Sequence, residues 1–321
     1  MQERQPVAYS DTRRQLIAEQ HTILRGQVGS GLHGVTVSSQ DDRDEMGVCI
    51  EPPQYLIGTR DLLGSEHSFE MYQYRTQPEG VRSGPGDLDL TVYSLRKWAD
   101  LAAKGNPTVL LLLFIPKKEL VTITEPGLDL QRNAGMFISR RAAHRFIGFL
   151  DSQREKLLGN KGYTPNRPEL IDKYGFDTKF AYHAIRLGIQ GTQLLTEGTI
   201  TLPMPQPHRT WLTDLRKGKY TLAEALDAIA DYRDRLERLA ATANWPEHAD
   251  RRRIDNWLVD TYEQWWDGHK QSRPALRTTL IESIVHTKLP CPAVPGVQHG
   301  PNLVDAGKLA DHIIRNLTAR R

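Results

Sequence analysis

The sequence predicts an α+β fold in which a small mixed-sheet domain precedes a helical domain, and three patterns along its 321 residues indicate this. Short strand-like segments separated by turns fill the first third of the chain, and residues at the helical period dominate from about residue 130 onward. The last fifty residues open with a Pro/Gly-rich stretch. We therefore expect domains at residues 1–125 and 126–270, followed by a C-terminal arm at residues 271–321.

The first elements are expected on either side of a glycine-serine turn. A helix is predicted over residues 11–22, and a short strand over 24–28 leads into the turn at Gly29 and Ser30. The chain is expected to leave the turn as a strand over residues 46–50. Two prolines end that strand, because proline lacks the N–H group that a central strand must donate.

A further strand and two helices are expected to complete this domain. A loop over residues 76–86 precedes DLDLTVY, residues 87–93, which alternates acidic or polar with apolar side chains at the strand period. Ser94 is a suitable N-cap and Gly105 a suitable C-cap for the helix between them. Pro107 then starts a new apolar element, since proline is accommodated in the first turn of a helix.

The second half of the chain is expected to be helical, with one interruption. The helical period marks three long segments, residues 140–158, 179–195 and 221–241. Between them, residues 199–208 are broken by prolines and should be extended. An amphipathic helix is predicted over residues 303–317, where the arm would pack against the body or a partner subunit.

Composition excludes several classes of protein. The chain is 39% hydrophobic and 25% charged, which is typical of a soluble globular protein, and it contains no apolar stretch of the ~20 residues that span a membrane. Its first residues lack the apolar core of a signal peptide, and two cysteines are too few for a disulfide framework or a zinc site. A cytoplasmic location is therefore expected. The net charge of +3 permits contact with nucleic acid without requiring it.

Two aspartates after the Gly-Ser turn indicate a metal site. Asp42 and Asp44 stand at i and i+2, so on an extended segment their carboxylates share one face and repel each other unless a cation lies between them. Mg²⁺ accepts such ligands and completes its shell with substrate phosphate, while the turn at Gly29 and Ser30 lets backbone N–H groups approach phosphates. The pattern predicts metal-dependent nucleotidyl transfer; a solvated strand end is the alternative.

The order of these residues resembles the nucleotidyltransferase superfamily that includes DNA polymerase β, whose motif is a Gly-Ser turn followed by a strand with two aspartates. Asp41 stands where that superfamily usually has a serine. Residues 89–114 and 177–203 resemble conserved blocks of the predicted nucleotidyltransferases of bacterial and phage RNA-repair systems, and the likeness covers roughly residues 20–240. The resemblance implies a polymerase β-like catalytic domain, an NTP substrate and an RNA acceptor such as tRNA.

A third carboxylate is expected on a later strand, as in polymerase β-like sites, because two-metal transfer must also hold the attacking hydroxyl. Asp89 is the preferred candidate since it stands closer to the strand interior, and Asp87 is the second. An ordinary exposed strand edge is the alternative. The predicted metal ligands and catalytic residues are therefore Asp42, Asp44 and Asp89, with Mg²⁺ or Mn²⁺ as cofactor.

A basic helix face is the candidate for binding the triphosphate. Lys179, His183 and Arg186 are spaced by four and three residues, which places them on one face of a helix, and they match the helical signature of the RNA-repair group. A lysine point charge and an arginine fork suit phosphate groups. The alternative is an exposed basic stripe. His33 inside the Gly-Ser loop is a further candidate for contact with a phosphate or a base.

Together these patterns predict an enzyme that transfers a nucleoside monophosphate from an NTP to an acceptor hydroxyl and releases pyrophosphate. Two alternatives stay open: the same chemistry on a protein or small-molecule acceptor, and a catalytically silent nucleotide- or RNA-binding module. The expected partners are an NTP and an RNA, without a membrane. The C-terminal arm is a candidate contact for a homo-oligomer.

Overall fold

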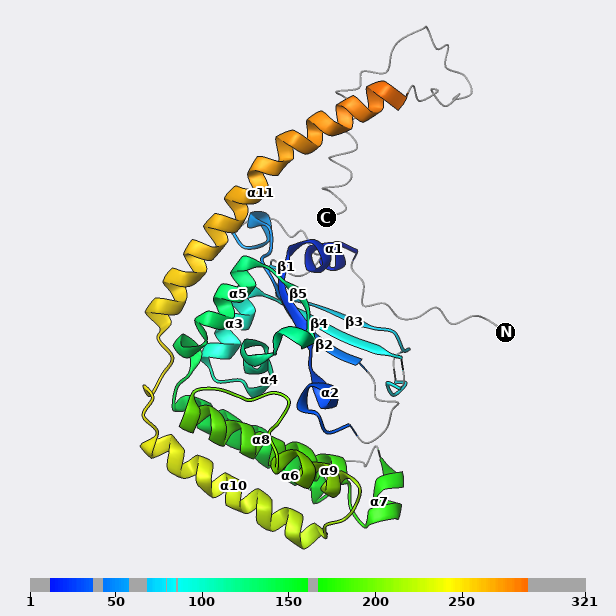
Figure 1. Cartoon of the computed structure of the whole chain (residues 1–321), viewed down its shortest axis with the longest axis vertical. Coiled ribbons are helices and arrows are strands. Elements are labelled where there is room, and N and C mark those ends of the chain that lie inside the picture. The colour runs from blue at the N-terminus through cyan, green and yellow to red at the C-terminus, as the bar shows by residue number, and fades with distance from the viewer. Residues whose placement is uncertain are drawn as a thin grey trace, which may run out of the picture.

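A computed structural model describes residues 12–36, 43–57, 68–78, 80–84, 86–160 and 167–287 (Figure 1). Asp41, Asp42 and the helix expected over residues 303–317 lie outside these ranges. The strands are β1 (Thr22–Gln27), β2 (Arg43–Cys49), β3 (Met71–Arg75), β4 (Leu88–Ser94) and β5 (Leu120–Ile123). The α-helices are α1 (Thr12–His21), α2 (Gly29–His33), α3 (Leu95–Ala103), α4 (Pro107–Leu110), α5 (Glu125–Arg132), α6 (Arg141–Leu157), α7 (Pro168–Tyr174), α8 (Thr178–Glu197), α9 (His208–Arg216), α10 (Leu222–Thr242) and α11 (Arg251–Thr287).

The strands form one mixed five-stranded sheet in the order β3-β4-β2-β1-β5. β2 and β4 run parallel, whereas every other neighbouring pair is antiparallel. β3 lies between β2 and β4 in the sequence but at the edge of the sheet, so β2 and β4 become direct neighbours with Asp44 opposite Asp89. The α+β class and the three predicted strands are confirmed, while β3 and β5 at the two edges were not predicted from the sequence.

The two faces of the sheet have different neighbours, because side chains alternate along each strand. On one face Met46 packs into the main hydrophobic core with the helices, and Asp44 belongs to the same alternating set. On the other face Leu90 packs in a smaller cluster with Ile17 of α1. The carboxylates of Asp44 and of its register partner Asp89 therefore stand on the side of the sheet that the larger helical layer covers.

Local signals set the helices that follow β4. The Ser94 hydroxyl accepts a hydrogen bond from the Lys97 backbone N–H at 3.1 Å, which is the N-cap expected from the sequence. Gly105 follows α3 with a φ of 77°, a left-handed conformation that glycine adopts without strain. The apolar run at residues 109–115 is helical, since it forms the end of α4 and a 3₁₀ turn, and nearly all of it is buried in the core.

Helices α6, α8 and α10 pack side by side below the sheet (Figure 1). A Cβ atom at Gly188 of α8 would lie only 2.4 Å from the Tyr232 Cβ of α10, so glycine permits the close approach of these two helices. The same hydrophobic core contains Val48 of β2 and Phe146 of α6. The sheet and these helices thus share one hydrophobic core. The division of the chain into two domains near residue 125 stays a prediction.

Helix α11 runs along the outside of the molecule and past the sheet (Figure 1). Its Tyr262 hydroxyl donates to a carboxylate oxygen of Glu51 at 2.8 Å, and its Trp266 Nε1 donates to the Glu51 backbone oxygen at 3.0 Å. Glu51 stands two residues after the end of β2, so these bonds attach α11 to the segment that follows the central strand of the sheet. Within the described ranges, no helix is long and apolar enough to cross a membrane.

The Glu51 contact predicts a pH-dependent stability. Burial raises the pKa of Glu51 from 4.5 to about 7, although the backbone and Tyr262 hydrogen bonds oppose this shift. Because the pKa is higher in the folded than in the unfolded state, the stability that this group supports falls as the pH rises between these two values. We expect Glu51→Gln to be more stable than the wild type by about 3 kcal/mol at neutral to alkaline pH and to lose this advantage below about pH 5. Thermal unfolding at several pH values measures this, and identical profiles for the two proteins would contradict it.

Candidate active site

A cavity of about 310 Å³ opens between β2 and β4 of the sheet, the short helix α2, and helices α4 and α8. Its lining brings together predicted site residues from four separate stretches of sequence: Gly29, Ser30, Asp44, Asp89, His183 and Arg186. Lys179 is half-buried but does not line the cavity, and Asp42 lies outside the described residues. Most of the residues selected from the sequence therefore meet at one place.

The two described carboxylates of the site are close neighbours. Asp44 of β2 and Asp89 of β4 are register partners on adjacent parallel strands, and both line the cavity. Neighbouring strands lie about 4.8 Å apart, so two carboxylates on one face at this register repel each other unless positive charge stands beside them. The sequence predicts two neighbouring carboxylates within one strand, at Asp42 and Asp44. The structure places a second such pair on two adjacent strands, at Asp44 and Asp89.

Asp89 is held by three polar side chains. Arg75 Nε donates to it at 2.7 Å, the Ser83 hydroxyl at 2.7 Å and Gln77 Nε2 at 3.0 Å. Partial burial raises the pKa of Asp89, but the hydrogen bonds from Ser83, Arg75 and Gln77 outweigh it, and the pKa lies below its usual value. Asp89 is therefore ionised at neutral pH.

Asp87, the second candidate for the third carboxylate, has a different environment. It stands before the first residue of β4 and is absent from the cavity lining. Its carboxylate accepts hydrogen bonds from the Gly84 backbone N–H at 2.8 Å and from the Thr76 hydroxyl at 2.9 Å. These bonds close the turn that leads into the strand, so the geometry favours Asp89 as the residue that faces a ligand.

The Gly-Ser turn is the start of helix α2. Gly29 has a φ of 74°, and the preceding residue, Val28, donates its backbone N–H to the Asp44 carbonyl oxygen at 2.8 Å. A Cβ atom built on Gly29 would lie 2.2 Å from Asp44 Oδ2. The backbone of the turn thus touches the carboxylate of β2 closely, and a side chain at position 29 would disturb both.

Gly29→Ala is expected to lower activity more than stability. The left-handed conformation costs an alanine about 1–2 kcal/mol, and the added methyl group must displace the Asp44 carboxylate from the cavity. We expect turnover to fall about 100-fold, since a displacement of about 1 Å in a positioned group costs that much. The measurement is kcat for nucleotide transfer beside the melting temperature. Gly31→Ala is a comparison in the same helix, because Gly31 has no positive φ and a Cβ there would meet only the flexible end of Gln27.

Arg186 of α8 lines the same cavity as the carboxylates and has no acidic partner among the described residues. Its Nη1 donates to Gln190 Oε1 at 2.7 Å, while its Nε atom is buried without a hydrogen-bond partner. Burial lowers the pKa of the Arg186 guanidinium, yet arginine stays charged at neutral pH. An anionic group in the cavity would supply the partner that this cation lacks.

Two histidines lie beside Arg186 and are neutral. His33 of α2 is buried, and its Nδ1 is 3.2 Å from Gln190 Nε2, so Gln190 links this ring to Arg186. Burial and then the Arg186 charge lower the pKa of His33 and of His183 well below the usual value. Both rings line the cavity.

Several lining residues were not selected from the sequence. Thr91 and Tyr93 follow Asp89 at the strand period of two, so the alternation in DLDLTVY carried a signal for them. Thr108 and Tyr182 carried no such signal, because their helices are brought to the cavity only by packing. Tyr182 also lies under the Arg216 guanidinium of α9, which stands 5.3 Å from its ring centroid.

The donor set fits a hard divalent cation. Asp44 and Asp89 offer carboxylate oxygens on one face at one register, which is the ligand type that Mg²⁺ and Mn²⁺ prefer. In the part of the chain that the structure describes, no three potential ligands cluster as a complete metal site. The third predicted ligand, Asp42, lies outside that part and two residues before Asp44.

The family model identifies the chain as a nucleotidyltransferase of the polymerase β type, and the mixed sheet agrees with this class. The chain belongs to the RNA repair pathway DNA polymerase beta family, whose model matches residues 4–260. A crystal structure of a nucleotidyltransferase-like protein from Exiguobacterium sibiricum is similar over 70% of this chain and 71% of that chain, at 11% identity and a TM-score of 0.25. No curated protein shows significant sequence similarity.

Proposed function

We propose that the enzyme transfers a nucleoside monophosphate from an NTP to the 3′ hydroxyl of an RNA, such as a tRNA, and releases pyrophosphate. One observation supports this most directly: a carboxylate pair and a cation without an acidic partner among the described residues line one cavity. A divalent cation bound by the two carboxylates and the guanidinium of Arg186 would both attract the phosphate groups of a polyphosphate. The family's description as an RNA repair pathway family supports RNA as the acceptor.

In this proposal the residues position charge around the reacting phosphate. The backbone at Gly29 and Ser30 and the Arg186 fork would bind the β and γ phosphates. Lys179 on the same helix would add to the positive potential, and the neutral His183 ring would offer a hydrogen bond to the nucleotide. Asp42, Asp44 and Asp89 would hold Mg²⁺ or Mn²⁺, which when bound neutralises the charge of the phosphate oxygens. Catalysis would rest on orientation and electrostatics.

The transfer itself would be an in-line displacement. The acceptor oxygen forms a bond to the α-phosphorus while the bond from that phosphorus to the bridging oxygen of pyrophosphate breaks. Asp89 is ionised and lies in the cavity, so it is the described side chain placed to orient the hydroxyl and accept its proton. Arg75 now neutralises Asp89, and we expect this ion pair to loosen when the substrates bind.

A labelled-transfer assay tests the proposal. The full chain would be mixed with each α-³²P-labelled NTP or dNTP, Mg²⁺ or Mn²⁺, and pools of RNA, DNA or protein. Label that enters RNA, and that does not enter it with an Asp42→Ala/Asp44→Ala double variant, would support RNA nucleotidyl transfer. Label in protein would identify the alternative acceptor. NTP binding without incorporation into any pool would leave a small-molecule acceptor or a silent binding module.

We propose the NTP and the RNA as partners together with the reaction. A homo-oligomer through residues 271–321 and a cytoplasmic location stay predictions. An RNA acceptor should bind with an affinity that falls steeply with salt, whereas a small acceptor should not. That comparison separates the acceptor classes even where turnover is slow.

A further inference from the structure

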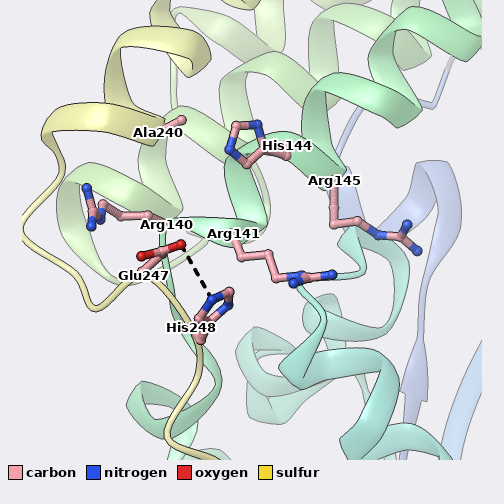
Figure 2. Close-up of a pocket in the computed structure, with 7 residues that line it drawn as sticks. All are labelled: Arg140, Arg141, His144, Arg145, Ala240, Glu247 and His248. Atoms are coloured by element: carbon pink, nitrogen blue, oxygen red, sulfur yellow. Dashed lines mark ion pairs between the residues drawn. The ribbon is translucent and has the colours of Figure 1, made fainter.

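A second pocket, distinct from the catalytic cavity, is lined mainly by basic side chains (Figure 2). It has a volume of about 510 Å³ and lies where the first turn of α6 meets the end of α10 and the segment between α10 and α11. Its lining residues are Arg140, Arg141, His144, Arg145, Ala240, Glu247 and His248. None of the residues predicted to bind the nucleotide or the metal belongs to it.

The positive charge of this pocket is concentrated on one helix face. Arg141, His144 and Arg145 stand at i, i+3 and i+4, so they project from the same side of α6, and all three are exposed. Figure 2 shows the Arg141 and Arg145 side chains extending to the same side, away from Glu247. The Glu247 carboxylate is 3.5 Å from His248 Nε2. Within the described residues, no carboxylate forms an ion pair with Arg141 or Arg145.

Four other helical arginines of this chain have acidic partners. Each of four pairs joins a guanidinium to a carboxylate within 3.3 Å: Arg132–Glu125, Arg233–Asp151, Arg235–Asp231 and Arg251–Asp100. Arg141 and Arg145 differ from these because they line one pocket and have no carboxylate partner among the described residues. A concave site with uncompensated guanidinium groups attracts phosphate, which their planar forks bind in a bidentate manner.

The framework of the pocket is held by backbone hydrogen bonds. The Arg140 and Arg141 backbone N–H groups donate to the carbonyl oxygens of Pro246 and Glu247, at 2.9 and 3.1 Å. Arg140 Nη1 donates to the Ala241 carbonyl oxygen at 3.1 Å. The first N–H groups of α6 are therefore already occupied, and the attraction for an anion comes from the side chains. The pocket wall is pre-organised.

The basic pocket is connected to the catalytic cavity through a short segment. A Cβ atom at Gly105 would lie 2.6 Å from the Ala142 Cα in the first turn of α6, so the chain passes directly against this turn. Pro107 and Thr108, which follow at the start of α4, line the catalytic cavity. The segment from Gly105 to Thr108 thus leads from the first turn of α6, beside the basic pocket, to the wall of the catalytic cavity.

We propose that the basic pocket binds backbone phosphates of the RNA acceptor and holds the strand while its 3′ end enters the catalytic cavity. This inference rests on the proposed function and adds the residues that bind the acceptor. Arg141 and Arg145 are separated by about 6 Å along the helix axis, so they can contact neighbouring phosphates of one strand. Phosphate contacts of this kind position a nucleic acid without reading its sequence.

The test compares RNA binding by the full-length wild type and by an Arg141→Glu/Arg145→Glu double variant. A short fluorescein-labelled single-stranded RNA is titrated at several salt concentrations. We expect the double variant to bind at least about tenfold more weakly, and its log–log salt slope to be smaller by about 1.4, since each phosphate contact on a single strand contributes about 0.7. A fluorescent ATP analogue should bind both proteins equally.

A matched control separates a local site from a change in net charge. Lys117→Glu/Lys118→Glu introduces the same charge change at two exposed lysines before β5, and it should keep the affinity and salt slope of the wild type. Equal losses in both double variants, unchanged RNA binding by the pocket variant, or wild-type binding to phosphatidylserine vesicles but not to RNA would overturn the inference. If the wild type binds RNA through the pocket but shows no ATP binding, the proposed catalytic function fails and the inference about RNA stands.

Discussion

Replacement of Asp44 by asparagine is expected to lower the rate of nucleotide transfer about 10³-fold, which corresponds to about 4 kcal/mol of transition-state stabilisation. Asparagine has nearly the same shape but lacks the negative charge that would hold a divalent cation beside Asp89. The measurement is kcat from label incorporation at saturating NTP and metal. Because the substitution also removes one of two neighbouring carboxylates, the metal-free variant should melt no lower than the wild type.

Asp87→Asn is the matched control for this prediction. Asp87 stands two residues before Asp89, accepts hydrogen bonds in a turn and does not line the cavity. The asparagine oxygen can still accept the Gly84 hydrogen bond, so we expect turnover within a few-fold of the wild type. A comparable loss in both variants, or full turnover in Asp44→Asn, would contradict the assignment of the carboxylate pair.

The second large effect is expected at Arg186. Arg186→Gln should weaken NTP binding about 10- to 100-fold, because hydrogen bonds to a charged group contribute about 1.5–3 kcal/mol. Arg186→Lys should have an intermediate affinity, since it keeps the charge but loses the fork that also binds Gln190. Calorimetric titration with ATP and with adenosine measures both affinities.

The contrast between the two ligands identifies what Arg186 contacts. If it binds phosphate, the affinity for adenosine should be the same in all three proteins, and only the affinity for ATP should change. Lys179→Gln should cause a smaller loss for ATP, because Lys179 lies on the same helix but outside the cavity lining. An equal loss for adenosine and ATP would instead indicate that the substitution disturbs the link from Gln190 to His33.

Local structure could be predicted from the sequence because it depends on short-range chemistry. The Ser94 N-cap, the left-handed glycine at residue 105 and the period-two alternation of β4 each act over a few residues, and each appears in the structure. Asp89 was preferred to Asp87 because it stands closer to the strand interior, and of the two only Asp89 lines the cavity. The edge strands β3 and β5 were missed, because few of their residues are fully buried and their pattern is weak.

The sequence by itself determined the α+β class, the order of its main elements and several of the residues that line the cavity, since propensity, capping and periodicity depend on neighbouring residues. Only the tertiary structure decided which of these residues meet. The parallel pairing of β2 with β4 places Asp44 beside Asp89, and the packing of α8 brings Arg186 over them. The basic pocket joins Arg141 to His248, and the Glu51–Tyr262 bond joins β2 to α11. These contacts join residues between 45 and 211 positions apart. They form because burying one shared core selects a single arrangement of the elements.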